Sequence, residues 1–393
     1  MKTLDEVALK GKRVFMRVDF NVPLDKERHV TDDLRIRAVL PSIEKVLASG
    51  GRLILASHLG RPKGKVLPEF SLRPAAERLA KLMGKPVFLA PDCIGPEVEN
   101  LVAQLKDGDL LLLENLRFHP EEEKNDPEFC RRLAGLADVY VNEAFAASHR
   151  AHASVEGMAH FVPVCAAGYR LQKEIDYFRK AMDNPQRPMA IIVGGAKVSS
   201  KIGLLENLIP RTDYLIIGGA MANTFFKARG LETGKSMVEE DFVEKARQLL
   251  AEGDKRGVKM LLPVDAVVAG EVSDGATSRQ VPIDKVSADM RILDIGEKSV
   301  ALFEAALTNC RTIIWNGPMG VFEKPPFDKG TFALAKFLGS LDALTVVGGG
   351  DSASALRQAK ADDKVSYIST GGGAFLEMLE GKELPGVSAL DKC

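Results

Sequence analysis

Short apolar segments alternate with segments of helical periodicity along the whole chain, and this alternation limits the possible folds more than any other feature. It predicts βαβ units and therefore parallel α/β sheets. In the first half, strands are expected at Val14–Val18, Leu53–Ser57, Val87–Leu89, Leu110–Leu113 and Val139–Asn142. In the second half, they are expected at Ala190–Val193, Tyr214–Ile217, Met260–Pro263, Ile292–Ile295, Thr312–Trp315, Thr345–Val347 and Val365–Ile368.

The chain of 393 residues is too long for a single hydrophobic core and fits two domains of ordinary size. Between the two series of strands, Tyr169–Met182 has helical spacing and is followed by Asn184-Pro185, a helix-ending pair. We interpret this segment as a helical linker. The predicted fold is therefore two doubly wound, Rossmann-like parallel-sheet domains joined by a helical hinge.

The overall charge and the cysteines exclude several classes of protein. A formal net charge of -1 argues against a general electrostatic grip on nucleic acid or on anionic membrane. The five cysteines are scattered singly, which fits a reducing cytosol better than a disulfide framework or a zinc motif. No signal peptide and no apolar segment of membrane-spanning length is recognisable. A cytoplasmic location is therefore expected.

The segment Met189–Leu208 reads as a buried strand, a glycine turn at Gly194-Gly195 and a helix that begins near Ala196. In that helix Lys197 and Lys201, four residues apart, would share one face beside unpaired backbone N–H groups. Two lysines on a surface helix are usually ordinary solvated charges. Because glycines at such a turn let a phosphate approach the backbone, we favour an anion site.

The two halves differ in the residues that come directly after their strands, where ligands of open parallel sheets bind. Strands of the second half end in glycine pairs or triplets, which suit a large polyanion or a flat base. Strands of the first half end in polar and charged side chains, which suit a small, highly charged ligand. These first-half residues include Asp19, Asn21, His58, Arg61, Arg117 and Arg150, with Arg35 on the next helix.

Two carboxylates of the second half are candidate ligand contacts. Glu323 ends the loop that follows Trp315, and it could accept hydrogen bonds from ribose hydroxyls or be an ordinary exposed loop residue. Asp351 follows Gly348-Gly349-Gly350 where a helix begins, so it could cap that helix or bind magnesium beside phosphates. Trp315 itself is expected in the core.

Taken together, these motifs resemble those of phosphoglycerate kinase, in the same order and over essentially the whole chain. The matching blocks are Arg-Val-Asp-Phe-Asn-Val-Pro at 17–23, His-Leu-Gly-Arg-Pro at 58–62, Glu-Asn-Leu-Arg-Phe at 114–118, His-Arg-Ala-His at 149–152, Gly-Gly-Ala-Lys-Val-Ser-Ser-Lys at 194–201, Trp-Asn-Gly-Pro-Met-Gly-Val-Phe-Glu at 315–323, Gly-Gly-Gly-Asp-Ser at 348–352 and Ser-Thr-Gly-Gly-Gly-Ala at 369–374.

The resemblance implies a glycolytic, monomeric kinase that transfers phosphate between 1,3-bisphosphoglycerate and ADP, giving 3-phosphoglycerate and ATP, with Mg2+. It implies a 3-phosphoglycerate domain at 1–168, a hinge helix at 169–184, a nucleotide domain at 185–378 and a tail at 379–393 that returns to the first domain. The implied 3-phosphoglycerate site comprises Asp19, Phe20, Asn21, Arg35, His58, Leu59, Gly60, Arg61, Arg117 and Arg150. The implied nucleotide site comprises Gly194, Gly195, Lys201, Gly218, Glu323, Gly349, Gly350, Asp351 and Ser352, with Asp351 as the metal ligand.

The chain departs from the family pattern at two places. Glu143 and Ala146 stand where many members have aspartate and glycine, which puts a longer carboxylate near Arg150, and Arg170 lies in a linker segment that is usually more apolar.

For catalysis, the nucleophile is a substrate carboxylate that is already ionised, so no general base is needed. We expect Arg35, Lys197 and the N–H groups of Gly371, Gly372 and Gly373 to stabilise the transferring phosphoryl group, with domain closure before transfer. Two other hypotheses are a non-catalytic two-lobe binding protein and a dehydrogenase. A coupled assay with ATP and 3-phosphoglycerate separates all three.

Overall fold

The computed structural model describes all residues from 1 to 393. Contacts within the chain separate it into two compact units, Met1–Ile175 with Glu383–Cys393, and Asp176–Lys382. The boundary falls inside one helix, α6 (Tyr169–Met182), which matches the helix expected in this segment. None of the helices is both long and apolar enough to cross a membrane.

The first unit is built on a six-stranded sheet in which every neighbouring pair is parallel. Its strand order is β3-β4-β2-β1-β5-β6, so β1 lies inside the sheet, with β2 on one side and β5 on the other. The strands are β1 (Arg13–Arg17), β2 (Arg52–Ala56), β3 (Phe88–Leu89), β4 (Leu110–Leu112), β5 (Val139–Asn142) and β6 (Cys165–Ala167).

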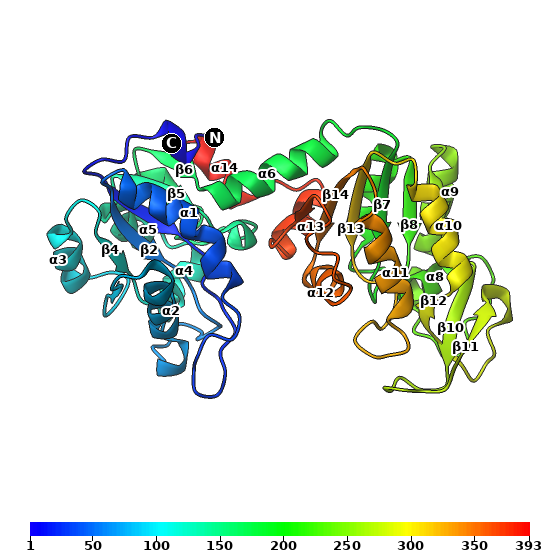
Figure 1. Cartoon of the computed structure of the whole chain (residues 1–393). Helices are drawn as coiled ribbons and strands as arrows, with labels where there is room; N and C mark the ends of the chain where they lie inside the picture. The colour runs from blue at the N-terminus through cyan, green and yellow to red at the C-terminus, as the bar shows by residue number, and fades with distance from the viewer. The chain divides into compact units, whose positions relative to one another are not determined.

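Helices cover both faces of this sheet, and Figure 1 shows α1 and α2 on the face towards the viewer. Ile43 of α1 and Leu79 of α2 are fully buried in one core with Val14 of β1 and Leu53 of β2. The helices of this unit are α1 (Leu34–Ala48), α2 (Arg73–Met83), α3 (Pro96–Gln104), α4 (Pro120–Lys124), α5 (Pro127–Gly135) and α14 (Pro385–Ser388). Its 3-10 helices are η1 (Leu4–Glu6), η2 (Pro68–Phe70), η3 (Leu116–Phe118), η4 (Phe145–Ala147), η5 (Gly157–Phe161) and η9 (Ala389–Asp391).

The C-terminal residues pack on the first unit, and the two chain ends lie side by side (Figure 1). The amino group of Met1 pairs with Asp391, and Asn142 Nδ2 donates to the carbonyl oxygen of Gly386 at 2.9 Å. Cys393 forms a disulfide with Cys165 of β6. The scattered cysteine spacing did not predict this bond, because it joins residues 228 positions apart.

The second unit contains a second six-stranded parallel sheet, with the order β15-β14-β13-β7-β8-β9. The strands of this second sheet are β7 (Met189–Val193), β8 (Tyr214–Ile217), β9 (Lys259–Leu261), β13 (Thr312–Asn316), β14 (Leu344–Gly348) and β15 (Tyr367–Ile368). Together the two sheets confirm the predicted pair of doubly wound parallel α/β sheets.

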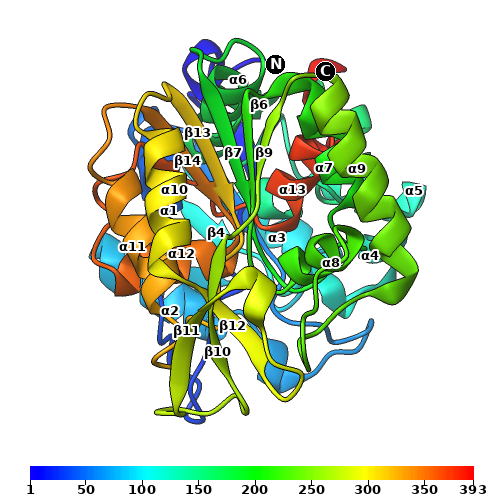
Figure 2. The same cartoon turned by 90° about the vertical axis from the view of Figure 1, so that its right-hand side faces the viewer.

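Figure 2 shows α10 and α11 on one side of the second sheet and α8 and α9 on the other. Phe303 of α10 and Leu334 of α11 are fully buried against Trp315, which is the core residue that the sequence suggested. The helices of this unit are α7 (Ile202–Leu208), α8 (Met221–Ala228), α9 (Val243–Lys255), α10 (Glu297–Leu307), α11 (Lys329–Leu338), α12 (Gly350–Gln358) and α13 (Gly373–Leu379). Its 3-10 helices are η6 (Ile209–Arg211), η7 (Glu240–Phe242) and η8 (Ile283–Lys285).

The second unit also has a small antiparallel sheet, which was not predicted. It contains β10 (Asp265–Ala269), β11 (Ser278–Pro282) and β12 (Arg291–Ile295), in the order β11-β10-β12. The strand expected at Ile292–Ile295 is therefore real, but its assignment to the parallel sheet was wrong. An apolar run marks a strand without identifying its partner, and β11 is too exposed to show an apolar pattern.

Candidate functional site

The loop after β1 is tied to the loop after β2 by two hydrogen bonds. The Phe20 N–H donates to Ser57 Oγ at 2.8 Å, and the Gly60 N–H donates to Asn21 Oδ1 at 2.9 Å. On the same loop, Asp19 Oδ2 forms an ion pair of 2.7 Å with Arg35 Nη1. Because the Arg35 side chain is 42% exposed, this pair orients the arginine without withdrawing it from a ligand.

His58 follows β2 and is buried against a second arginine. Nη2 of Arg17, the last residue of β1, lies 3.0 Å from His58 Nδ1. A guanidinium can only donate, so Nδ1 must be the acceptor and the imidazole proton must sit on Nε2. Burial and the neighbouring charges of Arg17, Arg117 and Arg150 hold the pKa of His58 well below its usual value. His58 is therefore a neutral hydrogen-bond donor through Nε2.

Arg17 is itself held by a buried polar network. Its Nε donates to Ser154 Oγ at 2.8 Å, and Ser154 donates through its hydroxyl and its backbone N–H to the Glu122 carboxylate at 2.6 and 2.9 Å. Glu122 is fully buried, and burial raises its pKa, while the charge of Arg17 acts in the opposite direction. The network fixes Arg17, and through it the tautomer of His58.

The remaining arginines differ in how firmly they are held. Arg117, in η3, is buried, donates to the Gly60 carbonyl oxygen at 2.9 Å and lies 3.4 Å from Glu123. Arg150 follows η4 and is close enough to lower the pKa values of His58 and Arg117 by its charge. Arg61 is exposed, and its side chain makes no hydrogen bond or ion pair in the chain. The structure thus gathers the expected residues after β1, β2, β4 and β5, with Arg61 at the surface.

Three of the residues that build this site were not predicted to belong to it. Arg17 and His152 lie inside the quoted motifs, and His152 lies near His58, because its charge contributes to the lowered pKa of His58. Ser57 directly precedes the His58 block. The sequence did contain one signal for Arg17, because a charged residue at the end of a buried strand is a candidate site residue.

The departure at Glu143 has a structural role that the sequence did not predict. Its buried carboxylate accepts hydrogen bonds from Ser42 Oγ and from the N–H groups of Arg170 and Leu171, the latter two at 3.0 and 3.2 Å. Glu143 therefore caps the N-terminus of α6, because those N–H groups have no partner within the helix. The expected position of this carboxylate near Arg150 stays a prediction.

In the second unit, a cavity of about 230 Å³ lies beyond the carboxyl ends of β7 and β13. Phe226, Leu293 and Met319 supply apolar walls, and Glu323, Asp351 and Asp294 supply carboxylates. Of the expected nucleotide residues, Gly195, Glu323 and Asp351 line this cavity. A flat aromatic base fits such apolar walls, and hydroxyl groups fit the exposed carboxylate of Glu323.

Gly194 and Gly218 act through close packing rather than as part of the cavity wall. A Cβ atom on Gly194 would lie 2.1 Å from the Pro318 carbonyl oxygen, and one on Gly218 would lie 2.3 Å from Met319 Sδ. Any side chain at either position would therefore displace the loop that forms one wall of the cavity. These two glycines shape the cavity by letting that loop approach.

Lys201 lies where β7 and β13 meet. Its Nζ donates to Asn316 Oδ1 at 2.5 Å, and Asn316 Nδ2 donates to the Gly348 carbonyl oxygen at 2.9 Å. Burial lowers the pKa of Lys201, and the charges of Glu380 and Asp351 partly offset this. Asn316 was quoted in a motif without a role, and this contact identifies it as the residue that positions Lys201.

The prediction that a helix begins near Ala196 is wrong, because α7 begins at Ile202. The intervening residues form turns: Ser200 Oγ donates to the Lys197 carbonyl oxygen, and Ser199 binds the Glu239 carboxylate. Such side-chain bonds compete with the helical pattern of backbone hydrogen bonds. Lys197 is therefore an exposed turn residue that does not share a helical face with Lys201.

The glycine triplets after β14 and β15 each lead into a helix. Gly349 precedes α12 with φ 94°, a conformation that favours glycine, and Gly350 begins the helix. Ser352 is buried and accepts a hydrogen bond from Gly317 N–H at 2.7 Å. Gly371 N–H donates to Ser369 Oγ, while Gly372 and Gly373 lead into α13.

Asp351 is the residue of this unit that best fits a metal ligand. It lies in the first turn of α12, is exposed, and does not cap the helix, because Gly349 occupies the N-cap position. Its carboxylate makes no side-chain hydrogen bond in the chain, so its oxygen atoms are available. Asp351 is therefore not the capping residue, and the two oxygen atoms of its carboxylate are of the type that Mg2+ prefers.

Comparisons with known proteins agree in what they find. Residues 4–382 match the family model described as phosphoglycerate kinase. A phosphoglycerate kinase of Syntrophobacter fumaroxidans is 67% identical over 100% of this chain and 99% of its own length. One from Chlorobaculum tepidum is 55% identical over 99% of each chain. The solved structure of phosphoglycerate kinase from Coxiella burnetii is similar with a TM-score of 0.92, at 40% identity over 99% of this chain and 98% of its own.

The charge surrounding His152 predicts a loss of stability in acid. Burial and the charges of Arg117, Arg17 and Arg150 lower its pKa to about 4. Between pH 6.5 and 4 the unfolded chain therefore binds a proton that the folded chain does not, so stability falls as pH decreases through this window. Between pH 7 and 5 this effect should lower the free energy of unfolding by about 1 to 2 kcal/mol, and His152→Gln should remove that part of the loss.

Urea unfolding at the two pH values measures this difference. His29→Gln is the matched control for the histidine-to-glutamine change itself, because the His29 side chain is 75% exposed. An unchanged pH dependence in His152→Gln would contradict the assigned environment of His152.

Proposed function

The chain belongs to the phosphoglycerate kinase family, and on this basis we propose how its residues carry out the family's reaction. It is a glycolytic kinase that transfers a phosphoryl group between 1,3-bisphosphoglycerate and ADP, giving 3-phosphoglycerate and ATP, reversibly. Its substrates are small molecules, and one of them is a nucleotide.

The first unit binds 3-phosphoglycerate in this proposal. The observation that carries it is the excess of positive charge after β1, β2, β4 and β5. Arg35, Arg117 and Arg150 converge there with the neutral donor His58, and only Asp19 and Glu123 form ion pairs with these arginines. Such a cluster needs an anion, and a phosphate with a carboxylate supplies two groups that arginines bind by paired hydrogen bonds.

The residues of this site then have different roles. His58 donates from Nε2 to a substrate oxygen, because Arg17 occupies Nδ1. Arg117 and Arg150 neutralise the substrate phosphate or carboxylate, and Asp19 with Asn21 positions the loop and the remaining polar contacts. Phe20 and Leu59, both buried, and the half-buried Gly60 supply the loop framework, and Arg61 contacts the ligand from the solvent side.

The second unit binds the nucleotide. The base lies against the apolar walls formed by Phe226, Leu293 and Met319, and Glu323 accepts from the ribose hydroxyls. Lys201, held by Asn316, binds the phosphate groups. Gly349, Gly350 and Ser352 bring backbone N–H groups to the same region, at the start of α12.

Mg2+ is held by Asp351 in this proposal and, when bound, neutralises charge on the nucleotide phosphates. The chain's own residues perform the remaining tasks. Arg35 of the first unit and Lys197 of the second are both exposed, and both donate hydrogen bonds to the phosphoryl group during transfer. The backbone N–H groups of Gly371, Gly372 and Gly373 donate to the same group. No residue needs to remove a proton, because the attacking carboxylate is already ionised.

Lys197→Ala should keep near-normal 3-phosphoglycerate binding but lose turnover by about a hundredfold or more, because a preorganised charged donor is removed from the transition state. A coupled assay with ATP and 3-phosphoglycerate measures turnover and also tests the family activity in the wild type. The control is Lys235→Ala, another exposed lysine of this unit, which should retain full activity. Normal turnover with weakened substrate binding would refute the assigned role.

Asp351→Asn should weaken binding of the Mg-nucleotide by at least tenfold and leave 3-phosphoglycerate binding unchanged, since only the second unit loses a metal ligand. Calorimetric titration of each ligand separately measures both effects. Asp362→Asn changes an exposed carboxylate of the same unit and serves as the control. The metal assignment fails if nucleotide affinity in Asp351→Asn depends on Mg2+ as it does in the wild type.

Transfer requires the two substrates to meet, and we propose that the units close when both are bound. Each ligand alone contacts mainly one unit, so it has little differential affinity for a closed state and cannot shift the equilibrium far. Small-angle scattering should therefore give a smaller radius of gyration with 3-phosphoglycerate and Mg-nucleotide together than with either alone. Equal radii in the ligand-free, singly bound and doubly bound protein would exclude closure.

We also propose a monomer located in the cytoplasm, where glycolytic substrates occur, with no nucleic-acid or membrane partner. Both substrate sites are built from residues of one chain, which supports the monomer. The Cys165–Cys393 disulfide is an observation against a reducing compartment, since cytosolic proteins rarely keep disulfides. Light scattering of the purified protein and fractionation of cells measure these two properties.

A further inference from the structure

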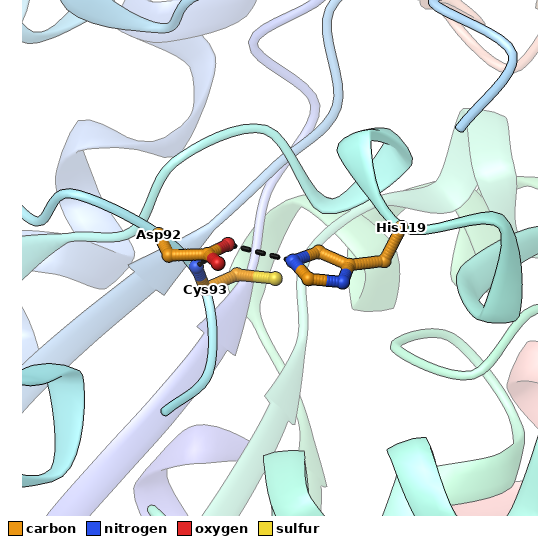
Figure 3. A group of neighbouring side chains, drawn as sticks. All are labelled: Asp92, Cys93 and His119. Atoms are coloured by element: carbon orange, nitrogen blue, oxygen red, sulfur yellow. Dashed lines mark hydrogen bonds and ion pairs between the residues drawn. The ribbon is translucent and has the colours of Figure 1, made fainter. Parts of the chain in front are cut away.

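Three side chains that lie outside the substrate sites meet at one place in the first unit (Figure 3). Asp92 and Cys93 follow β3, and His119 follows η3, 27 residues from Asp92. One potential metal-binding atom from each of the three lies within 4.8 Å of the other two. Figure 3 shows the Cys93 sulfur and the Asp92 carboxylate both directed towards the imidazole of His119.

We propose that Asp92, Cys93 and His119 form a binding site for Zn2+ or a chemically similar divalent ion. A thiolate, an imidazole and a carboxylate are the three ligand types that Zn2+ takes in proteins. Mg2+, the ion of the kinase reaction, prefers oxygen atoms and does not compete well for such a set. The site is therefore distinct in chemistry and in location from the one at Asp351.

The geometry needs only small movements to accept the ion. His119 Nε2 lies 2.7 Å from Asp92 Oδ1, which also accepts from the Cys93 N–H at 2.7 Å. A tetrahedral Zn2+ keeps its ligand atoms roughly 3.3 to 3.6 Å apart, from bonds of about 2.0 Å to N and O and about 2.3 Å to S. The hydrogen-bonded pair must open by roughly half an ångström, and the other pairs need to close by no more than about 1.5 Å, because all three atoms lie within 4.8 Å of one another.

The surroundings hold the three ligands while leaving a path for the ion. Cys93 is fully buried, whereas the side chains of His119 and Asp92 are 24% and 42% exposed. The ion can therefore enter from the solvent side and keep water as its fourth ligand, as three-ligand zinc sites do. The ring of His119 lies 5.4 Å from that of Phe129, which restrains the imidazole.

The backbone near the ligands is also anchored to the sheet. The Ala90 N–H donates to the Leu112 carbonyl oxygen at 2.8 Å, and the Glu114 N–H donates to the Asp92 carbonyl oxygen at 3.3 Å. The ligand-bearing loops are thus attached to β4 and the residues after it. The folded protein therefore already orders these loops, so less conformational entropy is lost when the ion binds.

Binding involves no change of oxidation state. Before binding, His119 Nε2 carries the ring proton that it donates to the Asp92 carboxylate. On binding, this proton moves to Nδ1 by exchange with solvent, Nε2 and the Asp92 carboxylate bind the ion, and the Cys93 thiol loses its proton to solvent and binds as thiolate. One proton is released for each ion bound. The hydrogen bond between Asp92 and His119 is replaced by two bonds to the ion.

Cobalt provides the direct test, because Co2+ bound to a thiolate gives a charge-transfer band in the near ultraviolet. Titration of the whole protein with Co2+ in excess Mg2+ should give this band and saturate at one ion per chain, and Zn2+ should displace it. Cys93→Ser should abolish the band. Cys130→Ser is the matched control, because Cys130 is also a buried free cysteine of this unit, and it should retain the band.

Two further variants keep the test decisive if Cys93→Ser does not fold. His119→Gln and Asp92→Asn should each lower Zn2+ affinity at least tenfold in competition with a coloured chelator, since removal of even a supporting group of a metal site costs this much. Circular dichroism checks that each variant is folded. Absence of the band in the wild type, its persistence in Cys93→Ser, or unchanged Zn2+ affinity in the two other variants would overturn the proposal.

Discussion

Parallel pairing around β1 and β7 is the constraint on which both candidate sites depend. Each of these strands is the first of its sheet along the chain and ends up inside it, so later strands are added on both sides. In a parallel sheet all carboxyl ends lie at one edge, and the change of direction beside the first strand leaves a crevice there. His58, Arg117 and Arg150 reach one such edge, and Lys201 with Asn316 reaches the other.

Buried charge in the first unit serves positioning more than stability. The desolvation of Arg17 and Glu122 costs free energy, and their hydrogen bonds through Ser154 act against this cost. The same contacts fix Arg17 against Nδ1 of His58, so the imidazole presents a defined N–H. The arrangement is destabilising in acid, because the same positive charges disfavour protonation of His58 and His152.

The two lysines of the second unit show how tertiary context separates residues that look equivalent. Lys201 is partly buried and held by Asn316. Lys197 is exposed in the segment between β7 and α7. A similar contrast applies to Glu143, whose buried carboxylate caps α6 and ties the end of β5 to the helix in which the two units divide.

The sequence by itself determined the two parallel sheets, the helix at Tyr169–Met182 and the motifs at the end of each strand, because strand length, periodicity and glycine turns are local properties. Only the tertiary structure decided that β12 belongs to an antiparallel sheet, that α7 begins at Ile202 and that Arg17 orients His58. The same holds for the Cys165–Cys393 bond and for the meeting of Asp92 and Cys93 with His119. Each of these features depends on contacts between residues far apart in the chain or on side-chain hydrogen bonds that override local propensity. Neither kind of interaction can be predicted from a local sequence pattern.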